Sequence, residues 1–159
     1  MAKLHKAELA RQVVRESREY CISNVLFRHA VGKTLGVNVT DMECLGLIFF
    51  KGLASPSQLS EYSGLTSGAT TAMLDRLEQA GLIERRPNPQ DRRGTLIMID
   101  KQATEKVGPL FESLRIAQDR LVSSYSEKDL ELLSDFFSKS TRLWEQERVK
   151  IQEHLAGRA

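Results

Sequence analysis

The segment "SPSQLSEYSGLTSGATTAMLDRLEQAGLIERR", which begins at Ser55, constrains the fold more than any other part of the chain. Ser55 can cap a short helix that has proline at its first position, and Gly64 can end that helix. A longer helix then starts at Thr66 or Ser67 and stops at Gly81. A short helix, a glycine-containing turn and a longer helix together predict a helix-turn-helix.

Two strand patterns follow the longer helix directly. "LIERR" and "TLIMID" have strand-forming composition, and the intervening "PNPQDRRG" holds the prolines and the glycine typical of a turn. Helical spacing places one set of side chains of the longer helix on its buried face: Thr70, Met73, Leu74 and Leu77. The segment therefore predicts a helix-turn-helix followed by a β-hairpin wing.

Helical patterns occupy both ends of the chain. A first helix is predicted over residues 4–35, with Gly36 as its terminator. A second, mostly buried helix opens with Thr40 and Glu43 in capping-box spacing and runs to about Phe50. These helices precede the helix-turn-helix and give the chain a largely α-helical character.

After Asp100 two further helices are predicted. The first has an apolar stripe made of Val107, Phe111, Leu114, Ala117 and Leu121, and Gly108 with Pro109 predicts a kink or a shifted helix start. Ser126 and Asp129 form a capping signal for the second. Its stripe continues through Leu133, Phe136, Phe137, Ser140, Leu143 and Trp144 to Ile151 and Leu155. So long a stripe needs a partner surface.

The predicted fold class is mainly α with a small β-hairpin wing. A chain of 159 residues with 41% hydrophobic residues can bury one good core. We therefore expect a single domain over residues 1–159, with a winged helix-turn-helix lobe at 37–101. Residues 1–36 and 102–159 form a helical dimerisation lobe in this prediction.

Composition narrows the classes of function. No stretch approaches the roughly 18 consecutive apolar residues of a membrane span, and the N-terminal segment lacks the apolar core of a signal peptide, so we expect a cytoplasmic protein. Cys21 and Cys44 are isolated thiols, for which a disulfide framework is not expected. No cofactor motif, metal-ligand spacing or catalytic constellation is present, so neither a cofactor, a metal site nor an enzyme is predicted.

The placement of charge is more informative than its total of +2. Four of the five arginines between Ser55 and Asp100 fall within the predicted hairpin, namely Arg85, Arg86, Arg92 and Arg93. A focused positive edge on a nearly neutral lobe indicates an anionic partner such as DNA.

The longer helix of the helix-turn-helix suits the major groove of DNA, which admits one helix. Its outward side chains are small or polar, and the predicted major-groove set is Ser67, Gly68, Ala69, Thr71, Ala72 and Arg76. Ser67 and Thr71 can bond bases or phosphates, and the methyl groups can touch thymine. Because base-edge donors are few, we expect discrimination to depend on DNA shape as well.

The wing suits the minor groove. A guanidinium group at a hairpin tip can enter a narrow minor groove, and a neighbouring carboxylate can hold it extended. Asp91 and Arg93 have this spacing, with Arg92 between them; the alternative is that these charges only pair with one another in a solvated turn. Arg76 and Arg86 also have two interpretations, contact with phosphates or bracing of the wing through Asp91.

The segment "LDRLEQAGLIERRPNPQDRRGTLIMI" resembles the winged-helix signature of the MarR transcriptional regulators, and the resemblance spans nearly the whole chain. It implies a homodimer, built by the first and the last two helices, that binds a pseudo-palindromic double-stranded DNA operator. By the same resemblance Arg93 enters the minor groove, Asp91 positions it and the helix from Ser67 enters the major groove. Ligand-released repression is the function this implies.

The resemblance also implies sensitivity to small aromatic ligands or to thiol oxidants. The candidate pocket residues are Tyr20, Cys44 and Phe49. The alternative is that these side chains only pack the core. Cys21 lies among apolar neighbours and is expected to be a buried inert thiol, with redox sensing as the alternative. A further rival function is a winged helix that binds an acidic protein and no DNA.

Overall fold

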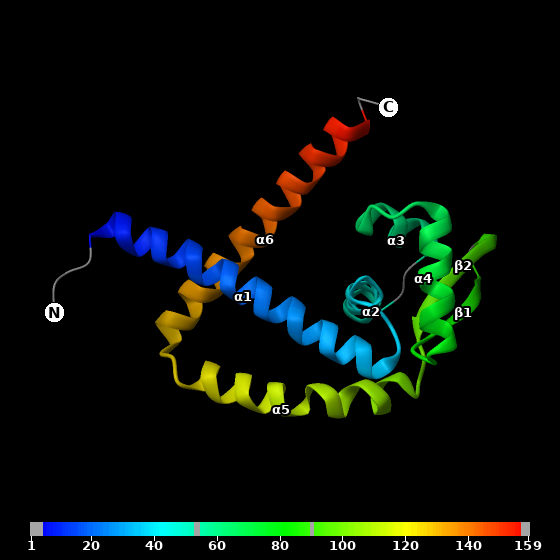
Figure 1. Cartoon of the computed structure of the whole chain (residues 1–159), viewed down its shortest axis with the longest axis horizontal. Coiled ribbons are helices and arrows are strands. Elements are labelled where there is room, and N and C mark those ends of the chain that lie inside the picture. Colours follow the sequence, from blue (N-terminus) through cyan, green and yellow to red (C-terminus); the bar gives the residue numbers. More distant parts are fainter. Residues whose placement is uncertain (1–4, 53–54, 90, 157–159) are drawn as a thin grey trace. The chain divides into compact units, whose positions relative to one another are not determined.

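The computed structural model describes residues 5–52, 55–89 and 91–156, and of residues 51, 91–93 and 155–156 it describes the backbone alone. Within these residues six helices and one antiparallel hairpin follow one another (Figure 1). Their bounds are α1 (Lys6–Leu35), α2 (Val39–Lys51), α3 (Pro56–Ser63), α4 (Ser67–Gln79), β1 (Ile83–Asn88), β2 (Asp91–Ile99), α5 (Ala103–Ser123) and α6 (Glu127–Ala156). The predicted fold class is confirmed. Residue 4, where the first predicted helix begins, lies outside the described residues.

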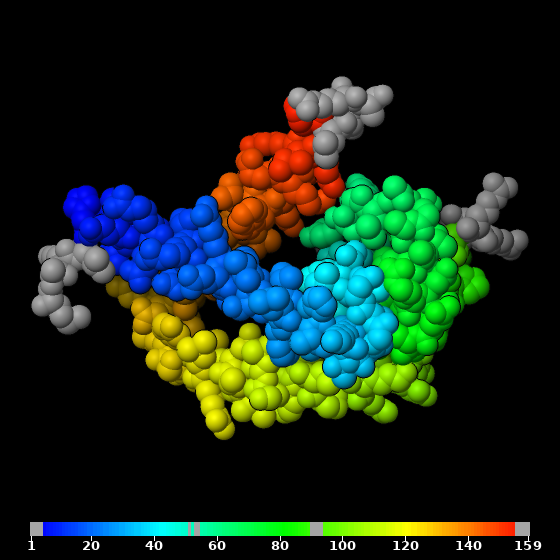
Figure 2. All heavy atoms as spheres, viewed as in Figure 1, coloured from blue at the N-terminus to red at the C-terminus, as the bar shows by residue number. Residues whose placement is uncertain are grey.

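The chain divides into two compact units, residues 1–106 and residues 107–159, and the division falls inside α5. The first unit contains α1 and the winged lobe, which we define as residues 37–101. In Figure 2 the atoms of α2 (cyan) and of α3 and α4 (green) form one continuous packed surface, from which the N-terminal part of α1 (blue) extends. No helix of the described residues is long and apolar enough to cross a membrane.

The caps of α1 and α2 follow local side-chain chemistry. α1 ends as predicted at Gly36, whose φ of 75° lies in the left-handed region. The predicted capping box of α2 at Thr40 and Glu43 is wrong. The cap is Asn38, whose side chain accepts the Asp41 N–H at 2.9 Å while the Asp41 carboxylate accepts the Asn38 N–H at 3.1 Å. Two overlapping sequence patterns offer a cap here, and the earlier one closes the helix end.

α3 and α4 form the predicted helix-turn-helix. Ser55 caps α3, and Gly64 ends it with a φ of 73°. In the turn, the Ser60 hydroxyl donates to the Leu65 carbonyl at 2.7 Å. Thr66 then caps α4. Gly64 therefore ends α3, the Ser60 hydroxyl stabilises the turn, and the Thr66 side chain caps the start of α4.

β1 and β2 pair antiparallel, in register from Ile83 opposite Ile99 to Pro87 opposite Thr95. Both strands extend into the segment that the sequence assigns to the turn, so the predicted strand ends at Arg86 and Thr95 were wrong. Pro87 can lie in a strand because each strand of a two-stranded sheet has a free edge, at which no ladder hydrogen bond is required.

The core of the winged lobe lies where α2, α3 and α4 meet the hairpin. Its side chains that are at most 2% exposed include Met42, Ile48, Leu59, Met73, Leu74, Leu77, Leu82, Ile83 and Ile97. The buried residues of α4 are the four that helical spacing predicts. This packing fixes which face of α4 is turned outward.

Thr70 carries a polar atom that the core does not satisfy. Its side chain is 1% exposed, and Oγ1 has no hydrogen-bond partner among the described residues. A buried polar group without a partner costs about 1–3 kcal/mol. We therefore expect Thr70→Val to raise the free energy of unfolding by about 1 kcal/mol in urea denaturation. Thr70→Ser, which keeps the hydroxyl and loses a methyl group, is the control and should destabilise; a destabilised valine variant would contradict the prediction.

In the second unit, most of α5 and all of α6 are long helices with exposed apolar side chains. α5 begins at Ala103 and passes through Gly108 and Pro109, so the shifted start proposed from these two residues was wrong. The predicted cap of α6 is confirmed, with the Asp129 N–H donating to the Ser126 hydroxyl at 3.3 Å. Exposed large apolar residues of α6 are Leu132, Phe136, Phe137, Leu143, Trp144, Val149 and Ile151. Neither α5 nor α6 buries these residues within the chain.

Candidate nucleic-acid interface

The outward face of α4 presents small side chains to solvent. The residues predicted to form it, Ser67, Gly68, Ala69, Thr71, Ala72 and Arg76, are all exposed. A Cβ atom at Gly68 would meet nothing within 4 Å, and the Thr71 hydroxyl donates to the Ser67 carbonyl at 3.0 Å. A bulky partner can therefore approach the α4 backbone closely, as a helix in the major groove requires. That these residues contact DNA stays a prediction.

Arg76 differs from its neighbours because a carboxylate holds its guanidinium group. Nε donates to Asp41 Oδ2 at 2.9 Å and Nη2 donates to Asp41 Oδ1 at 2.7 Å. The Asp41 side chain is fully buried, whereas that of Arg76 is 43% exposed. These hydrogen bonds, together with the attraction of the negative charges, raise the pKa of Arg76 above its usual value. Among the described side chains the partner of Arg76 is thus Asp41 on α2, and the predicted bracing through Asp91 lies outside the described side chains.

A second arginine ties α4 to the wing. Arg85 of β1 donates to Asp75 at 2.6 Å and to Glu78 at 3.0 Å, and both carboxylates lie on α4. Arg86 pairs with Glu84 of its own strand at 2.6 Å. Residues two apart in a strand share one face, which explains why Glu84 can reach Arg86.

Sequence reasoning missed the acidic partners of these arginines. Asp41, Asp75 and Glu78 were not singled out, because nothing local connects them to their partners: Asp41 and Arg76 are 35 positions apart. One signal was available for Asp41, which stands three residues after Asn38 in capping-box spacing. No comparable signal marks it as the partner of an arginine on α4.

The tip of the wing has an irregular backbone. After Pro87 opposite Thr95, the next pair is Asn88 opposite Asp91, so residues 92–94 have no residue opposite them in β1. Extra residues of this kind form a bulge, which re-aims side chains at the end of a hairpin. Arg92 and Arg93 therefore belong to a bulge of β2 and not to the predicted loop. The predicted ion pair between Asp91 and Arg93 lies outside the described side chains.

The three candidate pocket residues differ in burial. Cys44 is 1% exposed and belongs to the core of the winged lobe, while Tyr20 on α1 and Phe49 on α2 are exposed.

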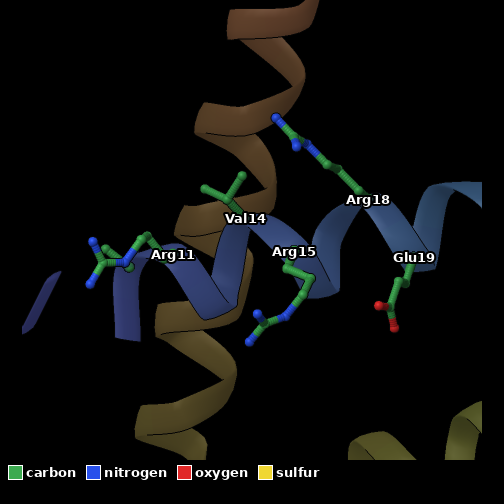
Figure 3. A pocket seen from close by; sticks show the side chains of 6 residues that line it. Arg11, Val14, Arg15, Arg18 and Glu19 are labelled. Carbon is green, nitrogen blue, oxygen red and sulfur yellow. The ribbon is translucent and has the colours of Figure 1, made fainter. Parts of the chain in front are cut away.

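A shallow surface hollow on α1 is lined by Ala10, Arg11, Val14, Arg15, Arg18 and Glu19. In Figure 3 its three guanidinium groups point away from one another, so the hollow does not form a site for a single anion. The described residues also contain no cluster of three His, Cys, Asp or Glu side chains that could hold a metal ion.

The two cysteines differ sharply in environment. Cys21 is exposed, which corrects the expectation of a buried thiol: its apolar neighbours on α1 are themselves exposed. Cys44 is buried, and desolvation, with smaller contributions from the charges of Asp41 and Glu43, raises its pKa to about 11. Since the thiolate is the reactive form, Cys44 should be inert near neutral pH.

We predict that iodoacetamide at pH 8 does not alkylate Cys44 in the folded chain. Both burial and the raised pKa withhold the thiolate, and the protection should persist until the pH approaches the pKa of about 11. Peptide mass spectrometry after a timed reaction measures this, with the urea-unfolded chain as the control that labels at both cysteines. Labelling of folded and unfolded Cys44 at equal rates would contradict the prediction.

The fold and the site define a winged helix-turn-helix protein. The outward face of α4 is exposed, and the hairpin of β1 and β2 that follows it carries arginines. A model of the MarR family matches residues 37–95. The HTH-type transcriptional regulator YcgE of Bacillus subtilis is 30% identical over 148 residues, which cover 93% of this chain and 96% of that protein. The multiple antibiotic resistance protein MarR of Salmonella typhimurium is 33% identical over 87 residues, or 55% of this chain and 56% of that protein. The chain belongs to the MarR family of DNA-binding transcriptional regulators.

Solved structures agree on the fold. RV1404 from Mycobacterium tuberculosis has a TM-score of 0.64 at 22% identity, covering 89% of this chain and 96% of its own. A mutant of Escherichia coli MarR, solved in complex with operator DNA, has a TM-score of 0.51 at 21% identity, covering 81% and 95%. At these identities the likeness supports the winged fold alone.

Proposed function

We propose that the chain is a homodimeric repressor that binds a pseudo-palindromic operator and is released from it by a small aromatic ligand. The observation that carries this proposal is the outward face of α4, which is exposed, made of small side chains and followed directly by the wing. A dimer presents two such helices about one DNA turn, roughly 34 Å, apart.

In this proposal α4 enters the major groove and the wing enters the minor groove. Ser67 and Thr71 bond bases or phosphates, and Gly68, Ala69 and Ala72 allow the backbone to approach the base edges. The N-terminus of α4 also favours a phosphate. At the wing, Arg93 reaches into the minor groove, Asp91 positions it, and Arg86 and Arg92 contribute charge near the phosphates.

Exposed apolar side chains on α1, α5 and α6 support the dimer. They include Leu9, Val13, Val14, Ile22, Val25 and Leu26 on α1, Leu121 and Val122 on α5, and the α6 residues named above. A soluble monomer rarely exposes so much apolar surface, and a two-fold interface would cover it. We accordingly assign dimerisation to residues 1–36 and 102–159 and DNA binding to the winged lobe.

The proposed ligand is a small aromatic molecule. Tyr20 and Phe49 are exposed aromatic side chains that can stack on a small aromatic molecule. Cys44 contributes through the packing of α2 because its own side chain is buried. A change in operator affinity upon adding phenolic compounds would support this assignment.

The DNA-binding proposal is tested by fluorescence anisotropy. The chain is titrated against labelled duplex from the DNA upstream of its own gene at two salt concentrations. Tight binding that weakens steeply with salt is the expected result, because phosphate neutralisation releases counterions. Absence of salt-sensitive binding to any upstream duplex would favour the rival, a winged helix that binds an acidic protein. The pairing of Arg76, Arg85 and Arg86 with carboxylates is the observation that keeps this rival in view.

A further inference from the structure

Asp41 is a fully buried carboxylate that accepts hydrogen bonds both at the start of its own helix, α2, and from α4. It accepts the backbone N–H of Asn38 at 3.1 Å and so completes the cap of α2. It also accepts two hydrogen bonds from Arg76, at 2.9 Å and 2.7 Å, in a bidentate arrangement. A planar guanidinium group bound in this way is held in orientation as well as in distance. The first turn of α2 is thereby joined to the C-terminal half of α4.

Two further side chains hold α4 at the same end. Arg85 of β1 binds Asp75 and Glu78 of α4, and Lys106 Nζ donates to the Ala80 carbonyl at 3.2 Å. These contacts come from β1 and from the start of α5, whereas the Asp41 contact comes from α2. The C-terminal half of α4 is therefore held by contacts from α2, β1 and α5. Its N-terminal half carries the small residues that face outward.

We infer that Asp41 is a positioning residue for operator binding: through Arg76 it sets the angle at which α4 meets the major groove, and Arg76 serves this framework and not the DNA. This inference rests on the proposed operator binding. Ser67 lies nine residues, or about 14 Å of helix, from Arg76. A tilt of about 10° at Arg76 would then displace Ser67 by about 2 Å, which is enough to break a hydrogen bond to a base edge.

Arg76→Lys is the variant that separates positioning from phosphate contact. Lysine keeps the positive charge, so it still compensates Asp41 and can still neutralise a phosphate, but it lacks the planar fork. The affinities for an operator duplex and for a non-operator duplex of equal length are measured at three salt concentrations. We expect the operator-to-non-operator affinity ratio to fall about tenfold, the discrimination of one well-made base contact, with the salt slope unchanged.

A loss of folding stability alone would not change the ratio of operator affinity to non-operator affinity. Partial unfolding lowers the active fraction and reduces both affinities equally, so their ratio is preserved. The matched control is Arg115→Lys, because Arg115 makes a similar two-hydrogen-bond pair with Glu112, at 2.9 Å and 2.8 Å, outside the winged lobe. Since Arg115 lies in the segment assigned to dimerisation, sedimentation velocity first verifies that this variant has the association state of the wild type. This control should leave the ratio unchanged.

Asp41→Asn provides a second test with the opposite electrostatic sign. Removing a negative charge from a DNA-binding lobe strengthens DNA binding on electrostatic grounds, yet the inference predicts a fall in the ratio like that of Arg76→Lys. If Asp41→Asn does not fold, Arg76→Lys decides alone.

A wild-type ratio in Arg76→Lys would overturn the inference. So would a phosphate role for Arg76, seen as a salt slope lowered by about one in Arg76→Gln together with a lysine variant that binds as the wild type does. Failure of the wild type to distinguish operator from non-operator DNA would instead overturn the proposed function itself.

Discussion

Replacing Trp144 by glutamate is expected to dissociate the dimer at micromolar concentration and to weaken operator binding by at least about a hundredfold. Trp144 is 68% exposed in the single chain and lies on the apolar stripe of α6. A charge buried without a partner costs several kcal/mol, and two-fold symmetry applies that cost twice. A monomer then holds only one half-site, so the affinity gained by joining two winged lobes is lost.

The control places the same charge on the opposite side of α6. At about 100° per residue, Ser138 lies about 200° around the helix axis from Phe136 and about 240° from Trp144, so Ser138→Glu should leave the dimer intact. Sedimentation velocity gives the association state, and anisotropy on the operator gives the affinity. A Trp144→Glu chain that remains dimeric and binds as the wild type does would remove α6 from the interface.

Arg93→Ala is expected to weaken operator binding by about tenfold to a hundredfold, the range of one charge-assisted contact of about 1.5–3 kcal/mol. Arg93 belongs to the bulge of β2 at the wing tip, where the strands no longer pair one to one. In the minor groove its guanidinium group meets concentrated negative potential. The slope of log affinity against log salt should also fall, by about one for a lost phosphate contact.

Arg115→Ala is the matched control for this experiment, since it removes the same charge from an exposed position on α5 outside the winged lobe. Thermal unfolding of both variants should match the wild type within the small range of surface substitutions, about 0.5 kcal/mol. Undiminished operator affinity in Arg93→Ala would exclude the minor-groove role and leave the wing charges to solvate the hairpin.

The helix-turn-helix was predictable because its information is local. The cap at Ser55, the glycine at Gly64 and the buried face of α4 all depend on residues within a turn or two of one another. The cap of α2 was misplaced for the same reason: two capping patterns overlap within six residues, and only the folded helix shows that Asn38 closes it.

The features that sequence could not supply are tertiary. The pairing of Arg76 with Asp41 joins residues 35 positions apart, and no periodicity connects them. The predicted burial of Cys21 was wrong for a different reason. Its apolar neighbours indicated a buried face, but burial in one chain requires an element that covers that face, and the periodicity of α1 does not say whether that element belongs to the same chain.

Hydroxyl-radical footprinting on the DNA upstream of the gene tests the central claim most directly, because it shows symmetry and groove contacts together. A dimeric winged-helix regulator should give protected regions related by a two-fold axis, with centres about 10 base pairs apart, and Arg93→Ala should lose the outer minor-groove protections. A single asymmetric footprint, or protection unaffected by Arg93→Ala, would contradict binding as a two-fold dimer with its wings in the minor groove.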